Sequence, residues 1–281
     1  MPPIRIVGDS TCDLSPELLE EYHIDIVPLY VNLGGKIYRD TGEITSEKIY
    51  EYVKETGVLP GTVGSSVGDF TECFKGLREQ GFEVVCVTIS ADMSCTYQNA
   101  KIAAEEVGGV YVVDSRNLSS GNGHVVLNAA IMARSGMSAQ EIARELEQIT
   151  PKVRASFILD NLDYMKKGGR CSSVTLLGAN MLKIKPTIFV EGGNMKVGQK
   201  FRGLLIRVLE EYVDAQLGGR KDIRTDRIFI THTGNSREQV EIVRARIEQH
   251  LHFDAITETH AGATITSHCG PNTLGILFIE K

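Results

Sequence analysis

Three times in its first half, the chain passes from a short apolar run to a polar loop and then into a segment with helical periodicity. The apolar runs cover residues 4–8, 84–89 and 110–113, and their length and polar boundaries are typical of buried strands. Strands that alternate with helices form a parallel sheet, because a parallel pair needs a long crossover connection. The first half therefore predicts an α/β fold, with a mostly parallel sheet and helices on both faces.

The second half of the chain has a different order of elements. Strand-like runs at residues 155–160, 186–190, 227–231, 255–267 and 273–279 are mixed with helical segments at 173–183, 204–217 and 237–251. This order predicts a second α/β lobe, with a mixed sheet and helices on one face. A chain of 281 residues is near the size at which one hydrophobic core divides in two. We therefore expect lobes at residues 1–150 and 151–281, with the boundary close to Thr150.

Glycine-rich segments interrupt the first half. Residues 57–68 are predicted to be a loop, and a glycine-rich turn at residues 121–123 precedes a helix at 123–134. The loop contains Gly64-Ser65-Ser66-Val67-Gly68, a formal match to the G-x-S-x-G nucleophile elbow of α/β-hydrolases. That motif needs a strand directly before the serine, whereas the residues around Pro60 are typical of a loop. The spacing gives little support to a hydrolase built on Ser66.

Composition excludes several classes of protein. With 42% hydrophobic and 23% charged residues, the chain is typical of soluble globular proteins. No apolar run approaches the ~18 residues of a membrane span, and no basic segment followed by an apolar core marks a signal peptide. Six cysteines are scattered singly, without the close pairs of a zinc site, so reduced thiols are expected. We expect a cytoplasmic protein with no metal site and no integral membrane association.

The distribution of charge and the lack of phosphate-binding motifs argue against nucleic acids and nucleotides as ligands. Residues 1–150 carry 11 Lys and Arg against 22 Asp and Glu, and residues 151–281 carry 19 against 14. The acidic first half argues against nucleic-acid binding, and the basic second half could face an acidic partner. No G-x-G-x-x-G or G-x-x-x-x-G-K-[ST] motif follows a strand, so the sequence indicates no nucleotide cofactor.

One strand-to-helix turn is the best candidate for an anion site. Residues 90–100 connect the apolar run at 84–89 to an alanine-rich helical segment at 100–107. The first amides of a helix are free to donate, and the helix dipole favours negative charge there. The hydroxyls of Ser94 and Thr96 would add donors at the same point. The simpler alternative is that Ser94 only caps the helix, because serine is among the commonest N-cap residues.

Four polar residues in predicted loops form the candidate site: Thr62, Ser94, Arg170 and His268. The guanidinium of Arg170 suits recognition of a carboxylate or a phosphate. The sequence ties no carboxylate to His268, so a Ser-His-Asp triad cannot be asserted. Hydroxyls, an arginine and a histidine suit the binding of an anionic head group better than they suit catalysis. The alternative is a hydrolase or acyltransferase that uses Ser94 or Ser66 with His268.

Nearly the whole chain resembles the DegV family. The segments that carry the resemblance are residues 9–14, 62–70, 94–98, 113–116, 162–170, 182–186 and 268–271. The resemblance implies a two-lobed protein that binds one long-chain fatty acid, with the carboxylate at the junction of the lobes and the acyl chain in an apolar tunnel. Some members present the acyl chain to a separate fatty-acid kinase, which phosphorylates the carboxylate. The chain would then be a carrier in phospholipid metabolism and not itself an enzyme.

The resemblance also assigns roles to the candidate residues. Thr62 and Ser94 match the hydroxyls that hold the carboxylate. Arg170 matches an arginine near the head group, and His268 matches a histidine in the same polar network. Cys95 stands after the key serine, where the family usually has glycine, and would lie beside the carboxylate.

Two further features concern the partner and the fit of the ligand. Lys166 and Lys167, together with Arg170, are expected to contact the kinase or the phosphorylated product. The loop at residues 62–68 departs from the family's usual Thr-Ser-Gln-Pro-Ser-Pro-Gly, and Thr266 stands where glycine is commoner. Both departures bear on access to the site and on the fit of the acyl chain.

Overall fold

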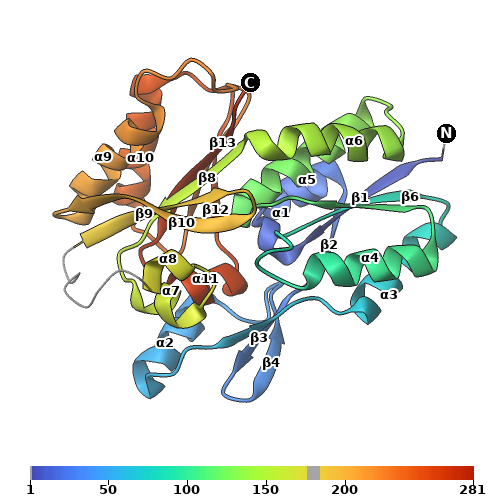
Figure 1. The fold of residues 1–281 in the computed structure, drawn as a ribbon, viewed down its shortest axis with the longest axis horizontal. Coiled ribbons are helices and arrows are strands. Elements are labelled where there is room, and N and C mark those ends of the chain that lie inside the picture. Colours follow the sequence, from blue (N-terminus) through green and yellow to red (C-terminus); the bar gives the residue numbers. More distant parts are fainter. Residues whose placement is uncertain (1, 176–183) are drawn as a thin grey trace.

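The computed structural model of the protein describes residues 2–175 and 184–281. Within these ranges the strands form a parallel sheet from the first half of the chain, a mixed sheet from the second half, and a small sheet beside them (Figure 1). The predicted α/β fold, with one parallel and one mixed sheet, is confirmed.

The first sheet is parallel throughout and has the strand order β2-β1-β6-β7. Its strands are β1 (Ile4–Asp9), β2 (Ile24–Val27), β6 (Glu83–Thr88) and β7 (Val110–Asp114). Helices α3 (Val67–Glu79) and α4 (Thr96–Val107) cover one face, and α5 (Ser119–Arg134) and α6 (Ala139–Ile149) cover the other (Figure 1). Helix α1 (Pro16–Tyr22) begins after Ser15, whose side chain accepts the amide of Leu18. Helices thus lie on both faces, as predicted.

The second sheet has the order β10-β9-β8-β13-β11-β12, and β11 and β12 are its parallel pair. Its strands are β8 (Val153–Ile158), β9 (Ile184–Glu191), β10 (Asn194–Arg202), β11 (Ile228–His232), β12 (Ile256–His260) and β13 (Leu274–Ile279). Helices α9 (Leu205–Leu217) and α10 (Arg237–His250) pack on one face. Helix α5 packs against the other face, so it lies between the two large sheets.

The small sheet has the order β4-β3-β5 and was not predicted as a unit. It consists of β3 (Tyr30–Leu33), β4 (Lys36–Arg39) and β5 (Gly61–Val63), and α2 (Ser46–Thr56) packs on it through a shared apolar cluster. Strand β5 lies inside the segment predicted to be loop. It is extended because its backbone pairs with β3, where Thr62 lies opposite Val31, and local sequence cannot show this partner.

Other elements also differ from the sequence-based expectation. The predicted strand at residues 255–267 is divided into β12 and a helix, α11 (Ala263–Cys269). Helix α5 begins at Ser119, so the predicted turn at residues 121–123 lies inside it. Two short helices, α7 (Asp163–Gly168) and α8 (Ser172–Thr175), precede residues 176–183. Residues 176–183 lie outside the described residues, and they make up most of the predicted helix at 173–183.

The two halves of the chain share a hydrophobic cluster. It includes Val85 and Val126 from the first half and Phe157 and Leu277 from the second. The predicted boundary at Thr150 falls at the start of a short 3-10 helix, Thr150–Lys152, between α6 and β8, and stays a prediction. In the described part of the chain, no helix combines the length and the apolar character needed to cross a membrane.

Candidate ligand-binding site

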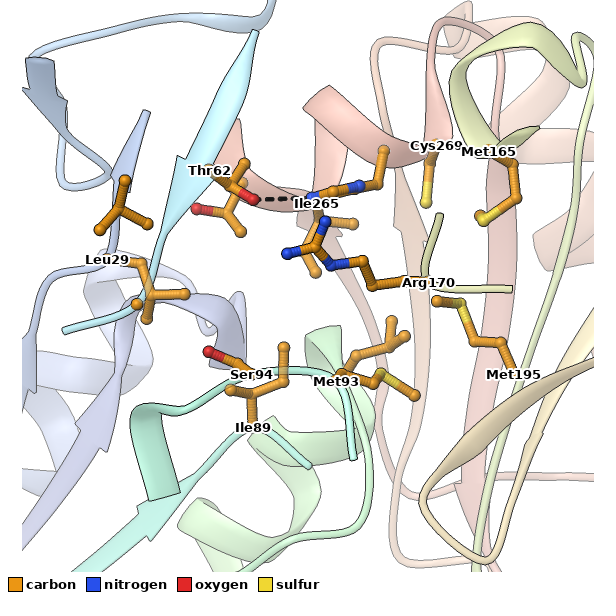
Figure 2. Close-up of a pocket in the computed structure, with 15 residues that line it drawn as sticks. Leu29, Thr62, Ile89, Met93, Ser94, Met165, Arg170, Met195, Ile265 and Cys269 are labelled. Carbon is orange, nitrogen blue, oxygen red and sulfur yellow. Dashed lines mark hydrogen bonds between the residues drawn. The ribbon is translucent and has the colours of Figure 1, made fainter. Parts of the chain in front are cut away.

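A cavity lies where the first sheet, the small sheet and α11 meet (Figure 2). It holds about 550 Å³ of space, part of which is open to solvent. Both halves of the chain contribute to its wall, which is formed by Leu29, Thr62, Val63, Gly64, Ile89, Met93, Ser94, Leu118, Met165, Arg170, Met195, Thr264, Ile265, His268 and Cys269.

The four candidate residues all line this cavity, although they come from four separate segments. Thr62 lies in β5, Ser94 in the loop before α4, Arg170 in the turn after α7, and His268 in the last turn of α11. The expectation that each lies in a loop is therefore wrong for Thr62 and His268. The fold nevertheless brings the predicted hydroxyls, the arginine and the histidine to one cavity.

The remaining candidates lie outside the set of residues that line the cavity. Cys95 is the N-cap of α4 and its side chain is exposed, with its sulfur 3.7 Å from the side-chain Nδ2 atom of Asn99. Lys166 is half-buried and Lys167 is exposed, and both lie on α7, close in sequence to Arg170. The structure thus places the lysines toward the surface and does not place the Cys95 side chain in the cavity wall.

The side chains of Thr62 and His268 form a hydrogen bond. Their Oγ1 and Nε2 atoms are 2.8 Å apart. Burial, with the nearby charge of Arg170, lowers the pKa of His268 to about 4, so the imidazole is neutral at neutral pH. Its Nδ1 atom is buried without a partner in the described part of the chain, so we assign the proton to Nε2. Nε2 then donates to Thr62, which leaves the Thr62 hydroxyl proton for an acceptor in the cavity.

Ser94 is held in a similar way by Thr96. The Thr96 amide donates to Ser94 Oγ at 3.2 Å, and the two hydroxyl oxygens are 2.8 Å apart. The N-cap position itself belongs to Cys95, one residue later than the sequence suggested, although Ser94 still accepts the first amide of α4. We assign the donor role in the contact between the two hydroxyls to Thr96, so the proton of Ser94 can point into the cavity.

Gly64 lies close to the hydroxyls of Ser94 and Thr96. A Cβ atom at Gly64 would lie 2.8 Å from Thr96 Oγ1 and 2.9 Å from Ser94 Oγ. Such contacts are shorter than real Cβ atoms allow, so the loop can approach α4 only with glycine here.

Ser66 is the N-cap residue of α3 and is not part of the cavity wall. Its hydroxyl accepts the amide of Asp69 and donates to the Asp69 carboxylate at 2.7 Å, which forms a capping box at the start of α3. Ser66 does not line the cavity, and His268 is bonded to Thr62 instead. The geometry therefore gives no support to the alternative enzyme that pairs Ser66 with His268.

Two buried carboxylates hold the N-terminus of α11, and sequence analysis missed them. Asp40 accepts the amides of Ala263 and Thr264 at 2.6 and 3.0 Å, and Asp13 accepts the amide of Gly262 at 2.8 Å. Burial raises the pKa of both carboxyl groups. Because α11 carries His268, these carboxylates help to position the candidate site.

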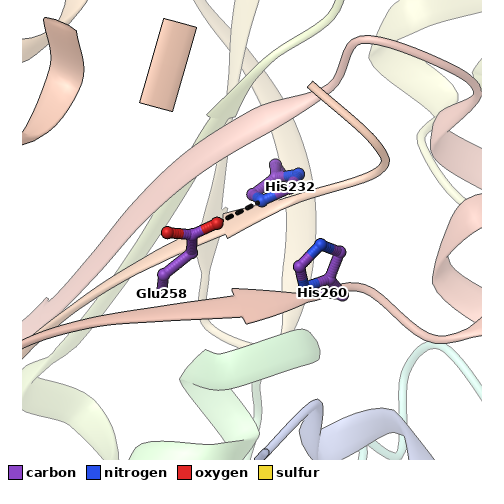
Figure 3. Close-up of side chains that lie close together, drawn as sticks. All are labelled: His232, Glu258 and His260. Atoms are coloured by element: carbon purple, nitrogen blue, oxygen red, sulfur yellow. Dashed lines mark hydrogen bonds and ion pairs between the residues drawn. The ribbon is translucent and has the colours of Figure 1, made fainter. Parts of the chain in front are cut away.

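A cluster of His232, Glu258 and His260 was also not predicted (Figure 3). The parallel register of β11 and β12 brings its ligand atoms within 4.8 Å of one another. His232 Nδ1 accepts two backbone amides, at 3.2 and 3.1 Å, so the proton lies on Nε2, which donates to Glu258 at 3.2 Å. Neither nitrogen of His232 then offers a lone pair to a cation, so the geometry favours a hydrogen-bonded pair over a metal site.

The fold is α/β, with one parallel and one mixed sheet, and its cavity is lined by both halves of the chain. The model of the family described as "Uncharacterised protein, DegV family" matches residues 3–281. The DegV domain-containing protein TTE1491 of Caldanaerobacter subterraneus is 33% identical over 283 residues, which cover 100% of both chains. The chain belongs to the DegV family, as its resemblance predicted.

Solved structures agree with this assignment. A DegV family protein from Thermus thermophilus, reported for its fatty acid binding, matches with a TM-score of 0.90 and 31% identity over 99% of this chain and 100% of that chain. A stearic acid-binding protein from Eubacterium ventriosum matches with a TM-score of 0.85 and 27% identity over 99% of this chain and 98% of that chain.

Proposed function

We propose that this protein binds one long-chain fatty acid, with the carboxylate held by Thr62 and Ser94. The observation that carries the proposal is that both hydroxyls line one cavity, each 2.8 Å from a neighbouring side chain. With His268 and Thr96 assigned as the donors in these two contacts, both hydroxyl protons are left for the ligand. Two such donors suit a single anionic group, and charge-assisted hydrogen bonds are the strong ones. The fatty acids bound by the Thermus and Eubacterium relatives support this ligand class.

The rest of the cavity wall suits a hydrocarbon chain. Away from the head-group residues it is formed mainly by aliphatic side chains and by Met93, Met165 and Met195. Methionine is flexible and polarisable, so it adapts to irregular apolar shapes. We propose that the acyl chain lies along this wall and that the protein is a carrier without catalytic residues or a cofactor.

The first prediction is that affinity rises with acyl chain length until the cavity is full. Burying a methylene contributes about 0.8 kcal/mol, so each added carbon should strengthen binding roughly fourfold. Displacement of a fluorescent fatty acid by unbranched acids from butyric to stearic acid measures this. Native mass spectrometry followed by denaturing extraction should recover a bound fatty acid from the purified protein. Equal competition by acetate or by a nucleotide would contradict the proposal, as would an empty protein that hydrolyses esters.

We also propose that the bound acid is presented to a separate fatty-acid kinase in the cytoplasm. Arg170 supports this role, because it lines the cavity and is itself exposed, and its Nη1 donates to the carbonyl of Gly168 at 3.0 Å. Lys167 on α7 is exposed nearby in the sequence. An acyl phosphate carries more negative charge than a carboxylate, so basic groups at the surface favour the product and the partner more than the free acid.

The second prediction separates these two roles. Arg170→Ala should keep its fatty acid within about threefold of the wild-type affinity, because exposed ionic contacts contribute little. It should lower the rate at which a fatty-acid kinase phosphorylates the bound acid. The matched control is Arg237→Ala, an exposed arginine at the start of α10. Loss of the lipid with unchanged phosphorylation per bound lipid would reverse the assignment of Arg170.

A further inference from the structure

Helices α7 and α11 pack against each other (Figure 1). Gly168, the last residue of α7, lies against the imidazole of His268 on α11. A Cβ atom at Gly168 would lie 2.5 Å from His268 Nδ1 and 3.4 Å from the Cγ atom of the ring. The first of these distances is shorter than real Cβ atoms allow. A larger residue at position 168 would therefore displace either the imidazole or the helix.

A second contact between the same two helices holds α7 in place. Gly270, the residue after α11, lies against the ring of Tyr164 on α7, and a Cβ atom there would lie 2.6 Å from Tyr164 Cδ2. Tyr164 is buried, and the ring of Tyr50 packs edge-on against it with 6.3 Å between the centroids. Because α7 is packed in this way, a side chain added at position 168 would displace the imidazole more readily than the helix.

The contact with Gly168 also restricts the protonation of His268. Nδ1 is buried beside Gly168 and has no hydrogen-bond partner in the described part of the chain. A proton on Nδ1 would be a buried donor without an acceptor, which is rare in folded proteins. The neutral ring therefore keeps its proton on Nε2, which lies 2.8 Å from Thr62 Oγ1.

We infer that Gly168 is a positioning residue for the fatty-acid carboxylate. Its missing side chain leaves room for the imidazole of His268 in the one position where Nε2 donates to Thr62, and Thr62 is then left to donate to the ligand. Gly168 itself is not among the residues that line the cavity. The inference rests on the proposed function and extends it, because it assigns the orientation of the Thr62 hydroxyl to a residue outside the cavity wall.

Nitrogen-15 NMR of the histidine rings in the lipid-free protein tests the first step without any ligand. Protonated and unprotonated ring nitrogens differ widely in chemical shift, and comparison with His268→Gln assigns the signals of His268. In the wild type at neutral pH we expect the proton on Nε2 and none on Nδ1. In Gly168→Ala the displaced ring should reach water, so the two tautomers should mix and the pKa of His268 should rise from about 4 toward its ordinary value.

Fatty-acid displacement tests the second step. Gly168→Ala should weaken binding by about three- to tenfold, because Thr62 loses the donor that directs its proton. The matched control is Gly76→Ala, since Gly76 is also a helical glycine but has open space where the Cβ atom would lie. This control should keep the wild-type affinity and the wild-type spectrum of His268.

A double-mutant cycle separates this role from a general effect on packing. The side-chain amide of glutamine can donate to Thr62 as the imidazole does, but it places no ring against position 168. Gly168→Ala should therefore cost less than about twofold in the His268→Gln background. Circular dichroism confirms the fold of each variant. An equal loss in both backgrounds, or a wild-type His268 spectrum in Gly168→Ala, would overturn the positioning role and leave fatty-acid binding in place.

The wild-type spectrum keeps the inference testable if Gly168→Ala does not fold, because a proton on Nδ1 of His268 in the wild type would overturn it directly. The proposed function has a separate outcome. A wild-type protein that binds no fatty acid, but shows the proton on Nε2, would overturn fatty-acid binding and leave the contact between Gly168 and His268 as the cause of the ring's orientation.

Discussion

Thr62→Ala and Ser94→Ala should each weaken fatty-acid binding by about one to two powers of ten. A hydrogen bond to a charged group contributes roughly 1.5–3 kcal/mol, and each variant removes one donor from the carboxylate. The double variant should lose less than the sum of the single losses. Both hydroxyls serve one carboxylate, so the second loss acts on a head group that has already moved toward water.

A double-mutant cycle measured by fatty-acid displacement tests this coupling. Circular dichroism should show that each variant is folded, because neither hydroxyl is part of a hydrophobic cluster. Thr41→Ala is a suitable control, since Thr41 is exposed and does not line the cavity. Wild-type affinity in both single variants would show that Ser94 serves only the start of α4, and that the anion binds elsewhere between the two halves.

The topology of the first sheet was predictable, because the hydrophobic periodicity of each segment matches the strand or helix that it forms. The alternation of apolar runs and helices in the first half gave the parallel sheet, because buried strands and amphipathic helices have different repeat lengths. The turn between β3 and β4 also has a clear local signal, since Gly34 and Gly35 supply its positive φ angles. In these places local chemistry and tertiary structure favour the same conformation.

Prediction failed where distant partners decide the local structure. The glycines at 121–123 predict a turn, yet they lie inside α5, where a Cβ atom at Gly123 would lie 2.5 Å from the carbonyl oxygen of Cys12. Glycine is present there for close packing. Similarly, β-branched residues at 264–266 favour a strand, but the segment is helical because Asp13 and Asp40, more than 220 positions away, accept its first amides.

The candidate site shows the same division. Residue types in predicted loops, together with the family motifs, identified Thr62, Ser94, Arg170 and His268, and the fold brings them to one cavity. Thr96 was expected to add a hydroxyl donor beside Ser94, but in the structure it is fully buried and bonds Ser94 itself. Its role as the partner of Ser94 appears only when the hydrogen bonds are known.

Asp40→Ala should destabilise the protein strongly. It leaves the amides of Ala263 and Thr264 without their acceptor at a site where Asp40 is only 7% exposed. A buried donor without a partner costs about 1–3 kcal/mol. Removing the buried charge returns part of this cost, because burial raises the pKa of the Asp40 carboxyl and so disfavours its ionised form. For the two amides together we expect a net loss of about 2–4 kcal/mol in the free energy of unfolding.

Urea denaturation of the lipid-free protein measures this loss, since a bound ligand would add its own stabilisation. Asp40→Asn should lie between Ala and the wild type, because its amide oxygen can still accept one of the two bonds. Asp254→Ala is the control, as Asp254 is exposed. Helix α11 carries His268, so the variant should also bind fatty acid more weakly under conditions where it is folded. A wild-type denaturation midpoint in Asp40→Ala would show that packing alone holds α11 in place, and that the carboxylate is not needed to form the site.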